Sequence, residues 1–368
     1  MKSERSVDDV GAADVPLPGN AWTRFWFTPI PATGLRVLRV LSGLLFCVWL
    51  LSFLGHQEAF FSLNGWLDAQ GYSDVQRQPG SGAPVGWSLL YLAGDNAAAF
   101  QAIYWLSVVV LVLFTLGVAT RFTAVYTWFI VVSFLANPAI SYDGDYLLAI
   151  LAFYLMIGHL FAGIWNGALS RVELVLGSRH DFVLAGWLLP GNAAERPLSY
   201  AANFMMRLVQ IHFVIIMVTS VLHRTQIAEW WSGVAFWFPL HPPFETTAES
   251  LEREISRPFI TLFLLSLIQY VAVGWQLCLP AFAWREGRAW RGLLLGGAIL
   301  YWLGVFFVFK LPLFGPFVLL CCLSFLRPQE WAWIVERTRS MFASAANDSP
   351  VPEPKKTVAL VGKENIKK

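Results

Sequence analysis

Long apolar stretches recur along the chain and are separated by short polar or proline-containing turns. A helix that crosses the hydrocarbon core of a bilayer needs about 20 predominantly apolar residues. Eight stretches approach this length and predict membrane-spanning helices, at 35–55, 98–119, 122–140, 145–165, 203–223, 258–281, 289–307 and 311–326. The last stretch is the shortest. The pattern therefore predicts an all-α, polytopic membrane bundle of about eight transmembrane helices.

The segments outside these stretches differ in composition. Residues 1–34 are mostly polar, and residues 327–368 form a polar, partly lysine-rich tail that we expect to be partly disordered. Residues 56–97 form a long loop with glycine and proline turns. Residues 224–257 are rich in aromatic side chains but too short to span, which is typical of an interfacial or re-entrant segment. The transmembrane domain is thus expected to cover 35–326.

The basic residues predict the orientation of the bundle. If the N-terminus is cytoplasmic, alternation across eight spans places 21 lysines and arginines on the cytoplasmic side and five on the other. Cytoplasmic loops carry such an excess of basic residues in membrane proteins. We therefore expect both termini in the cytoplasm, and both the 56–97 loop and the aromatic 224–257 segment outside.

Composition excludes several classes of protein. The 368 residues are 57% hydrophobic and only 14% charged, whereas soluble domains carry about 25% charged residues. A net charge of +2 excludes the dense basic surface that a nucleic-acid partner requires. The four cysteines lie inside apolar runs without metal-ligand spacing, so no metal site is predicted. The lipid bilayer, in the cell's inner or plasma membrane, is the expected environment.

Polar residues inside the fifth predicted span are candidates for function, because such residues are costly at membrane depth. His212, Thr219 and His223 fall within about 40° of one another on a helix, and Arg207 and Gln210 lie on roughly the opposite face. One interpretation is a substrate-lining face or a proton path. The other is interhelical hydrogen bonds with a terminal histidine at the interface.

Two further positions each allow two interpretations. Asp143 and Asp145 precede the fourth span, where they either bind a cation or cap the helix and favour its N-terminal dipole. Lys310 is the only lysine between Lys2 and Lys355. It is either a buried amine that acts as a base or a residue of a hairpin next to Pro312 whose charge extends to the interface. No hydrolase, P-loop, zincin or Rossmann motif occurs in a usable context.

Four short stretches occur in the order that one membrane family shows. They are Leu35-Arg36-Val37-Leu38-Arg39 with Ser42-Gly43, then Leu116-Gly117-Val118-Ala119-Thr120-Arg121, then Asn137-Pro138 with Gly144-Asp145-Tyr146-Leu147-Leu148, and finally Gln210 followed by Trp230, Gly233 and Ala235. From about Trp22 to Phe325 the chain resembles the horizontally transferred transmembrane (HTTM) superfamily, which includes the membrane domain of vitamin K-dependent gamma-carboxylases. The resemblance alone implies a cofactor, a vitamin K-type quinone.

The chain departs from the carboxylase pattern at the expected base. Where the family has a lysine shortly before the tryptophan, this chain reads Leu222-His223-Arg224-Thr225-Gln226. Arginine keeps its proton at physiological pH, whereas a neutral histidine accepts one. The candidate catalytic residues are therefore His223, Arg224 and Lys310, and the candidate substrate-lining residues are His212, Thr219, Asp143, Asp145 and Trp230.

Several functions stay open, including whether the chain is an enzyme. The first hypothesis is an HTTM-type membrane protein with redox activity on a quinone or a related lipid. The second is a non-enzymatic membrane protein that binds, matures or exports a protein or peptide partner on the external side, as one branch of the superfamily suggests. A secondary transporter is a third choice, because the inverted repeat that many transporters show is not visible.

Overall fold

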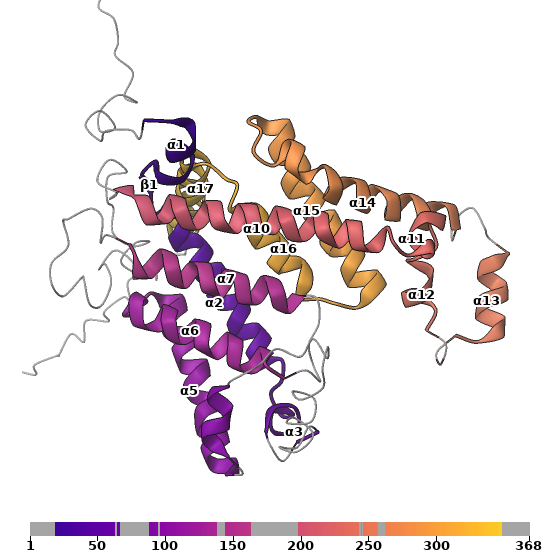
Figure 1. The fold of residues 1–368 in the computed structure, drawn as a ribbon, viewed down its shortest axis with the longest axis horizontal. Coiled ribbons are helices and arrows are strands. Elements are labelled where there is room, and N and C mark those ends of the chain that lie inside the picture. Colours follow the sequence, from indigo (N-terminus) through magenta and orange to yellow (C-terminus); the bar gives the residue numbers. More distant parts are fainter. Residues whose placement is uncertain are drawn as a thin grey trace, which may run out of the picture.

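The computed structural model describes residues 19–62, 65–66, 88–94, 96–137, 144–162, 198–242, 244, 246–256 and 262–347. Regular structure in these residues is almost entirely helical, which confirms the predicted all-α class (Figure 1). The helices are α1 (Ala21–Phe27), α2 (Thr33–Leu51), α3 (Gln57–Phe61), η2 (Leu89–Ala93), α5 (Ala97–Leu116), α6 (Thr120–Leu135), α7 (Gly144–Leu160), α10 (Tyr200–Arg224), α11 (Ala228–Ser232), α12 (Trp237–Leu240), α13 (Ala248–Ile255), α14 (Leu264–Phe282), α15 (Arg288–Phe309), α16 (Phe314–Leu323) and α17 (Pro328–Asn347).

Each of the eight predicted spans coincides with a helix, but these helices differ in length. Among the described helices, α2, α5, α10, α14 and α15 are long and apolar enough to cross a membrane. The apolar helices α6 and α7 have 16 and 17 residues, and α16 meets α17 at a bend of 117°. The protein is therefore a membrane-embedded helical bundle with five candidate spans, or six if the bent pair counts as one. The number eight and the orientation remain predictions.

Local sequence signals explain where several helices begin and end. The side chain of Asn96 accepts hydrogen bonds from the first turn of α5, and Ser199 caps α10 in the same way. Gly117 ends α5 with φ +83°, a left-handed conformation that glycine adopts without strain. Arg121 then donates to the carbonyl of Ala162 beyond the end of α7. The Leu116–Arg121 stretch therefore has a structural role, because it forms the α5–α6 turn and ties the start of α6 to the residues after α7.

The N-terminal segment packs against the beginning of α10. Strand β1 (Ile30–Pro31) pairs antiparallel with β2 (Leu198–Ser199), with Ile30 opposite Ser199. The amide of Asn203 donates to the carbonyls of Phe25 and Trp26, at 3.0 Å each. The second half of the polar 1–34 segment is thus an ordered part of the bundle.

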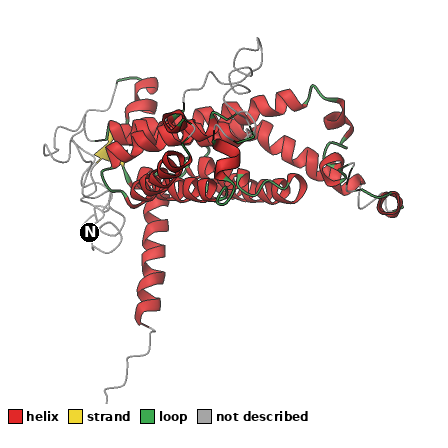
Figure 2. Ribbon diagram, turned by 90° about the horizontal axis from the view of Figure 1, so that it is seen from below, coloured by secondary structure: helices red, strands yellow, loops and turns green. Residues whose placement is uncertain are grey.

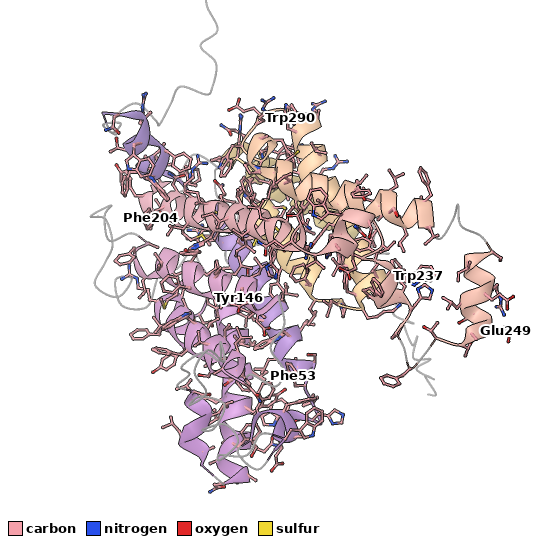
Figure 3. The ribbon with its side chains drawn as sticks, turned by 45° about the vertical axis from the view of Figure 1, so that its right-hand side comes forward. Phe53, Tyr146, Phe204, Trp237, Glu249 and Trp290 are labelled. Carbon is pink, nitrogen blue, oxygen red and sulfur yellow. The ribbon has the colours of Figure 1, made fainter. Side chains whose placement is uncertain are left out.

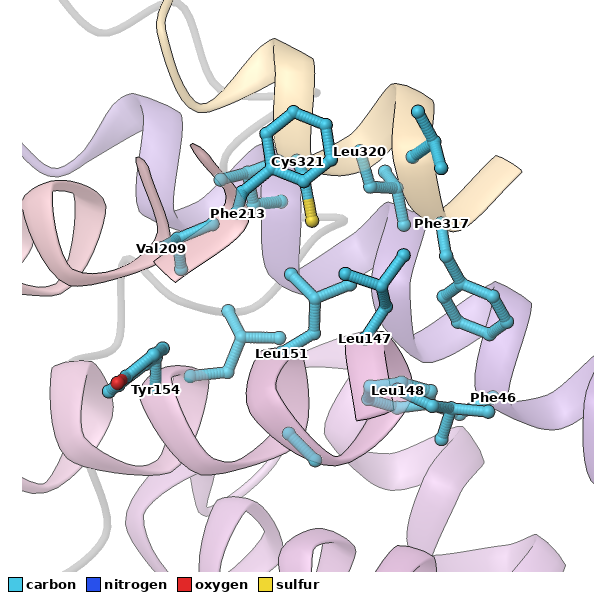
Figure 4. Close-up of a cluster of buried hydrophobic side chains, with 14 of the residues drawn as sticks. Phe46, Leu147, Leu148, Leu151, Tyr154, Val209, Phe213, Phe317, Leu320 and Cys321 are labelled. Carbon is cyan, nitrogen blue, oxygen red and sulfur yellow. The ribbon is translucent and has the colours of Figure 1, made fainter. Parts of the chain in front are cut away.

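A buried cluster joins α2, α7, α10 and α16 (Figure 4). Phe46, Leu151, Phe213 and Phe317 come from these four helices in turn, and each is at most 1% exposed. In a lipid environment such a cluster is held by close van der Waals packing, because the lipid is as apolar as the side chains. The cluster fixes α10, which carries most of the polar residues singled out from the sequence.

Helices α14 and α15 form a pair on the other side of α10 (Figure 1). Helix α14 packs on α10, and α15 packs mainly on α16. Because each helix rests on a different neighbour, the contact between α14 and α15 themselves is limited. This arrangement sets the position of the candidate site.

The first part of the 327–368 tail is more regular than the partly disordered tail that the sequence predicts. Residues Pro328–Asn347 form the helix α17, which points away from the bundle in Figure 2. Trp331 is buried against the bundle and anchors the start of this helix, and its neighbour Trp333 is exposed. The remainder of the tail lies outside the described residues.

The two predicted loops are described in part. Within 56–97, α3 and η2 are short helical turns, and the amide of Asn137 donates to the carbonyl of Phe60. Within 224–257, the helices α11, α12 and α13 are all too short to span, as the sequence predicted. Their position relative to a bilayer remains a prediction.

Candidate functional site

An apolar groove of about 1140 Å³ runs between α14 and α15 and reaches the end of α10, α11, Phe236 just before α12, and the start of α16. Its walls are aliphatic and aromatic side chains, for example Ile268 and Val271 of α14 and Leu300 of α15. Figure 3 shows Trp290 at one end of this helix pair and Trp237 near the other. Among the described residues that line the groove, the only charged ones are two arginines. The groove therefore fits an apolar molecule that also meets a cation.

Glycines keep the groove open. A Cβ atom added at Gly292, Gly296 or Gly304 of α15 would meet no atom within 4 Å. The opposite holds at Gly297, where an added Cβ would lie 2.0 Å from Nε1 of Trp275. This indole N–H donates to the carbonyl of Leu293 at 3.0 Å. The tryptophan thus holds α14 close to α15 at one level, while glycines leave the space beside it empty.

Arg224, the last residue of α10, points into this groove. One guanidinium nitrogen donates to Oε1 of Gln276 at 3.3 Å, and the guanidinium carbon lies 5.0 Å from the ring centre of Trp230. Gln276 is 1% exposed. Within the described residues no carboxylate forms an ion pair with Arg224. Its partners there are a neutral amide and an aromatic ring, neither of which neutralises its charge.

The turn that carries Trp230 is fixed to α14 by a buried amide. Gln269, which is 0% exposed, donates to the carbonyl of Trp230 at 2.9 Å and accepts from the backbone N–H of Phe236 at 3.3 Å. Ser266 donates to the carbonyl of Gly233 at 2.8 Å, and a Cβ at this glycine would meet the same serine. These contacts form a clamp between α14 and the turn from Trp230 to Phe236, and the clamp positions Trp230 beside Arg224.

Gln210 forms a second, separate polar centre on α10. Its Oε1 accepts from Arg207 at 2.9 Å and from the indole of Trp284 at 3.0 Å, and its Nε2 donates to the carbonyl of Ser324 at 2.7 Å. The guanidinium of Arg207 also lies 4.4 Å from the ring centre of Phe25. Because the amide of Gln210 is occupied on both sides, we assign it a structural role in joining α10, the end of α14 and the end of α16.

The predicted face of His212, Thr219 and His223 does not line the groove. All three residues are exposed. His212 contacts the hydroxyl of Tyr154 on α7, which matches the interhelical interpretation. The hydroxyl of Thr219 donates back to the carbonyl of Ile215 in its own helix. The helical period had separated the two faces of α10 correctly, but the face that packs inward carries Gln210 and Arg224.

The other candidates are also placed apart from each other. Lys310 is exposed and ends α15 in a left-handed conformation with φ +58°, so the interpretation as a buried amine is wrong. Asp145 is 8% exposed in the first turn of α7, a position that suits the helix dipole. Asp143 lies outside the described residues. Of the candidates that the structure describes, only Arg224 and Trp230 line the groove.

The two glutamines of α14 are not among the site residues predicted from the sequence. Gln269 and Gln276 are seven residues apart, which places them on one helix face within about 20°. Two amides at this spacing inside an apolar stretch can be recognised in the sequence and indicate a polar position on one face of the helix. A similar signal exists on α10, since Arg224 follows Gln210 by 14 residues and lies within about 40° of it.

The groove supports binding better than acid–base chemistry. None of the described residues that line it is a histidine, a lysine or a carboxylic acid, and Arg224 cannot release its proton to act as a base. Within the described part of the chain, no three histidine, cysteine or acidic side chains are grouped to hold a metal ion. The arrangement can donate hydrogen bonds, attract an anion and bury an apolar chain.

No family model, no curated protein and no solved structure matches this chain.

Proposed function

We propose that this chain is a multi-pass cell-membrane protein on an HTTM-like scaffold that binds an amphipathic, lipid-like molecule in the α14–α15 groove. The observation that carries the proposal is the position of the half-buried Arg224 in a mainly apolar groove. An ionisable side chain inside a membrane bundle is costly and marks a pathway or ligand site. The apolar walls accept a chain, and the arginine orients a polar end.

A quinone with a long apolar chain would fit the groove as a bound ligand rather than as a substrate that the groove converts. Arg224 and Trp230 would contact the ring, and the walls of α14 and α15 would cover the chain. Such a group supplies two-electron redox chemistry when bound. The described lining contains no proton acceptor that corresponds to the lysine of the carboxylases, because His223 and Lys310 do not line the groove. We therefore favour binding over turnover.

Lipids that remain bound after purification test this function. Protein extracted in mild detergent is compared with a Gly296→Leu variant, which fills the groove, and with an Ala102→Leu variant, which adds the same side chain on the exposed face of α5. We expect one lipid-like species to stay with the wild type and with Ala102→Leu but not with Gly296→Leu, as measured by mass spectrometry. Equal retention by all three proteins would refute the proposal.

The second candidate function is binding of a protein or peptide partner. It is supported by exposed aromatic side chains in the α11–α13 segment, where Trp231 is 67% and Phe238 is 56% exposed. Exposed aromatic clusters are frequent at protein interfaces. Photo-crosslinking from position 231 in native membranes tests it, with position 109 on the exposed face of α5 as the control. Identical crosslinks from both positions would count against a partner at the aromatic segment.

A further inference from the structure

We propose that the groove selects a lipid with an anionic head group, a carboxylate or a phosphate, and that this head group pairs with Arg224. The inference rests on the proposed function and adds the chemical class of the ligand. Its basis is that a cation of the groove lining has no counter-ion in the described structure, and that the buried amide beside it is only partly hydrogen-bonded.

The first of these groups is the guanidinium of Arg224. Three other arginines of the described chain form ion pairs, namely Arg253 with Glu249, Arg291 with Glu330, and Arg327 with Glu286. Arg224 is different, since its contacts in the described chain are the amide of Gln276 and the ring of Trp230. A guanidinium carries five N–H donors, so donors remain for a ligand after the bond to Gln276.

The second group is the amide nitrogen of Gln276. Its oxygen is committed to Arg224, because the reverse orientation would bring two donors together. In this orientation Nε2 is buried and has no hydrogen-bond partner in the described structure. A buried donor without a partner is destabilising. The amide of Gln276 therefore neither neutralises Arg224 nor is itself fully satisfied, and the charge of Arg224 remains available to a ligand in the groove.

A neutral head group would satisfy the hydrogen-bond donors of Arg224 but not its charge. A quinone carbonyl or an alcohol accepts a hydrogen bond but leaves the positive charge without a counter-ion in a medium of low dielectric constant. A carboxylate or phosphate accepts two parallel hydrogen bonds from a guanidinium and neutralises it. The charge of the site therefore favours an acid over its neutral analogue.

The length of the groove favours a lipid over a free anion. Its lining on α14 extends from Leu265 to Phe282, which is roughly 26 Å at 1.5 Å per residue. Gln276, the contact of Arg224, lies between these two residues. An anion bound there has apolar wall on both sides, which an attached hydrocarbon chain covers and an inorganic ion leaves bare.

Arg288 provides a matched control outside the groove lining. It is the first residue of α15, it is exposed, and it is not among the residues that line the groove. A change at Arg288 thus removes an equal charge from the same helix pair without changing the groove.

Photolabelling with two matched probes tests the inference. The full-length protein in nanodiscs of neutral lipid is labelled with a diazirine analogue of stearic acid or of stearyl alcohol, and labelled α14 and α15 peptides are quantified. We expect the acid to label wild type and Arg288→Gln on the order of tenfold more than the alcohol, because charge-assisted hydrogen bonds are roughly twice as strong as neutral ones. In Arg224→Gln the acid should fall to the level of the alcohol, and Arg224→Lys should restore part of the preference.

The outcomes separate the inference from the function on which it rests. Equal labelling by acid and alcohol in the wild type, or an acid preference that survives in Arg224→Gln, overturns the anionic class and leaves lipid binding intact. If millimolar inorganic phosphate displaces the acid, the site binds a free anion, and the claim that its ligand is a lipid is wrong. Labelling of α14 and α15 that is unchanged in Gly296→Leu for both probes overturns the proposed groove itself.

Discussion

The two hydrogen bonds by which Gln269 of α14 holds the turn at α11 allow a quantitative prediction for this residue. Replacement by leucine introduces an apolar side chain of roughly similar size and removes both hydrogen bonds of the amide, at 2.9 Å to the carbonyl of Trp230 and at 3.3 Å from the N–H of Phe236. Phe236 is 6% exposed, so its N–H would lose its partner in a buried place, which costs about 1–3 kcal/mol. The carbonyl of the half-buried Trp230 adds about 1 kcal/mol.

These terms give a local destabilisation of about 2–4 kcal/mol, which corresponds to a roughly 30- to 1,000-fold change in an opening equilibrium at 1.4 kcal/mol per factor of ten. Hydrogen exchange reports such local opening directly. We therefore expect amides in 228–236 to exchange faster by this factor in Gln269→Leu, while amides of α5 and α7 keep their wild-type rates.

Gln226→Leu is the control for this experiment. Gln226 lies just before α11 and is exposed, so the same change of residue type there should leave exchange in 228–236 within about twofold of wild type, as surface substitutions are usually within about 0.5 kcal/mol. If Gln269→Leu also leaves these rates unchanged, the amide does not hold the turn and the positioning of Trp230 has another cause.

Four further predictions follow from named contacts. Gln210→Leu should lower the thermal midpoint in detergent by several degrees, since it leaves Arg207 and Trp284 without their acceptor, whereas Thr219→Val should not, and fluorescence-detected size exclusion after heating measures both. Gly297→Ala should destabilise the fold because its Cβ would meet Trp275 at 2.0 Å, while Gly304→Ala should be tolerated because nothing lies within 4 Å; equal midpoints for the two variants would contradict the packing at Trp275. In detergent, a maleimide should give one rapid adduct by intact mass, at Cys278, since this cysteine is exposed and Cys47, Cys321 and Cys322 are buried; four adducts at similar rates would show that the core is open. His223→Ala should leave groove labelling by the stearic acid probe at the wild-type level, because His223 does not line the groove; a loss of labelling would bring it back as a site residue.

The sequence predicted the helices well and the site only in part. A stretch of about 20 apolar residues leaves few alternatives to a helix in a lipid environment, since every backbone group must be satisfied within the segment. This constraint is local, and it placed a helix at each of the eight apolar stretches. It also identified 224–257 as an aromatic segment too short to span.

The helical period gave the two faces of α10 but not their surroundings. It separated His212 and Thr219 from Gln210 correctly, because 100° per residue is a property of the helix alone. It did not reveal which face meets α14 and α16, because that depends on how other helices pack. The histidines were candidates because of their acid–base chemistry, but they are exposed. Arg224 lies on the inward face of α10 and lines the groove.

What the sequence by itself determined is therefore the class of protein: a membrane-embedded helical bundle, with its helices where apolar residues run without interruption. What only the tertiary structure decided is the groove and its single half-buried cation. The groove arises because α14 rests on α10 and α15 on α16, with glycines facing the space between them. Arg224 of α10 and the glycines of α15 lie far apart along the chain, and only the packing of separate helices brings them to one groove.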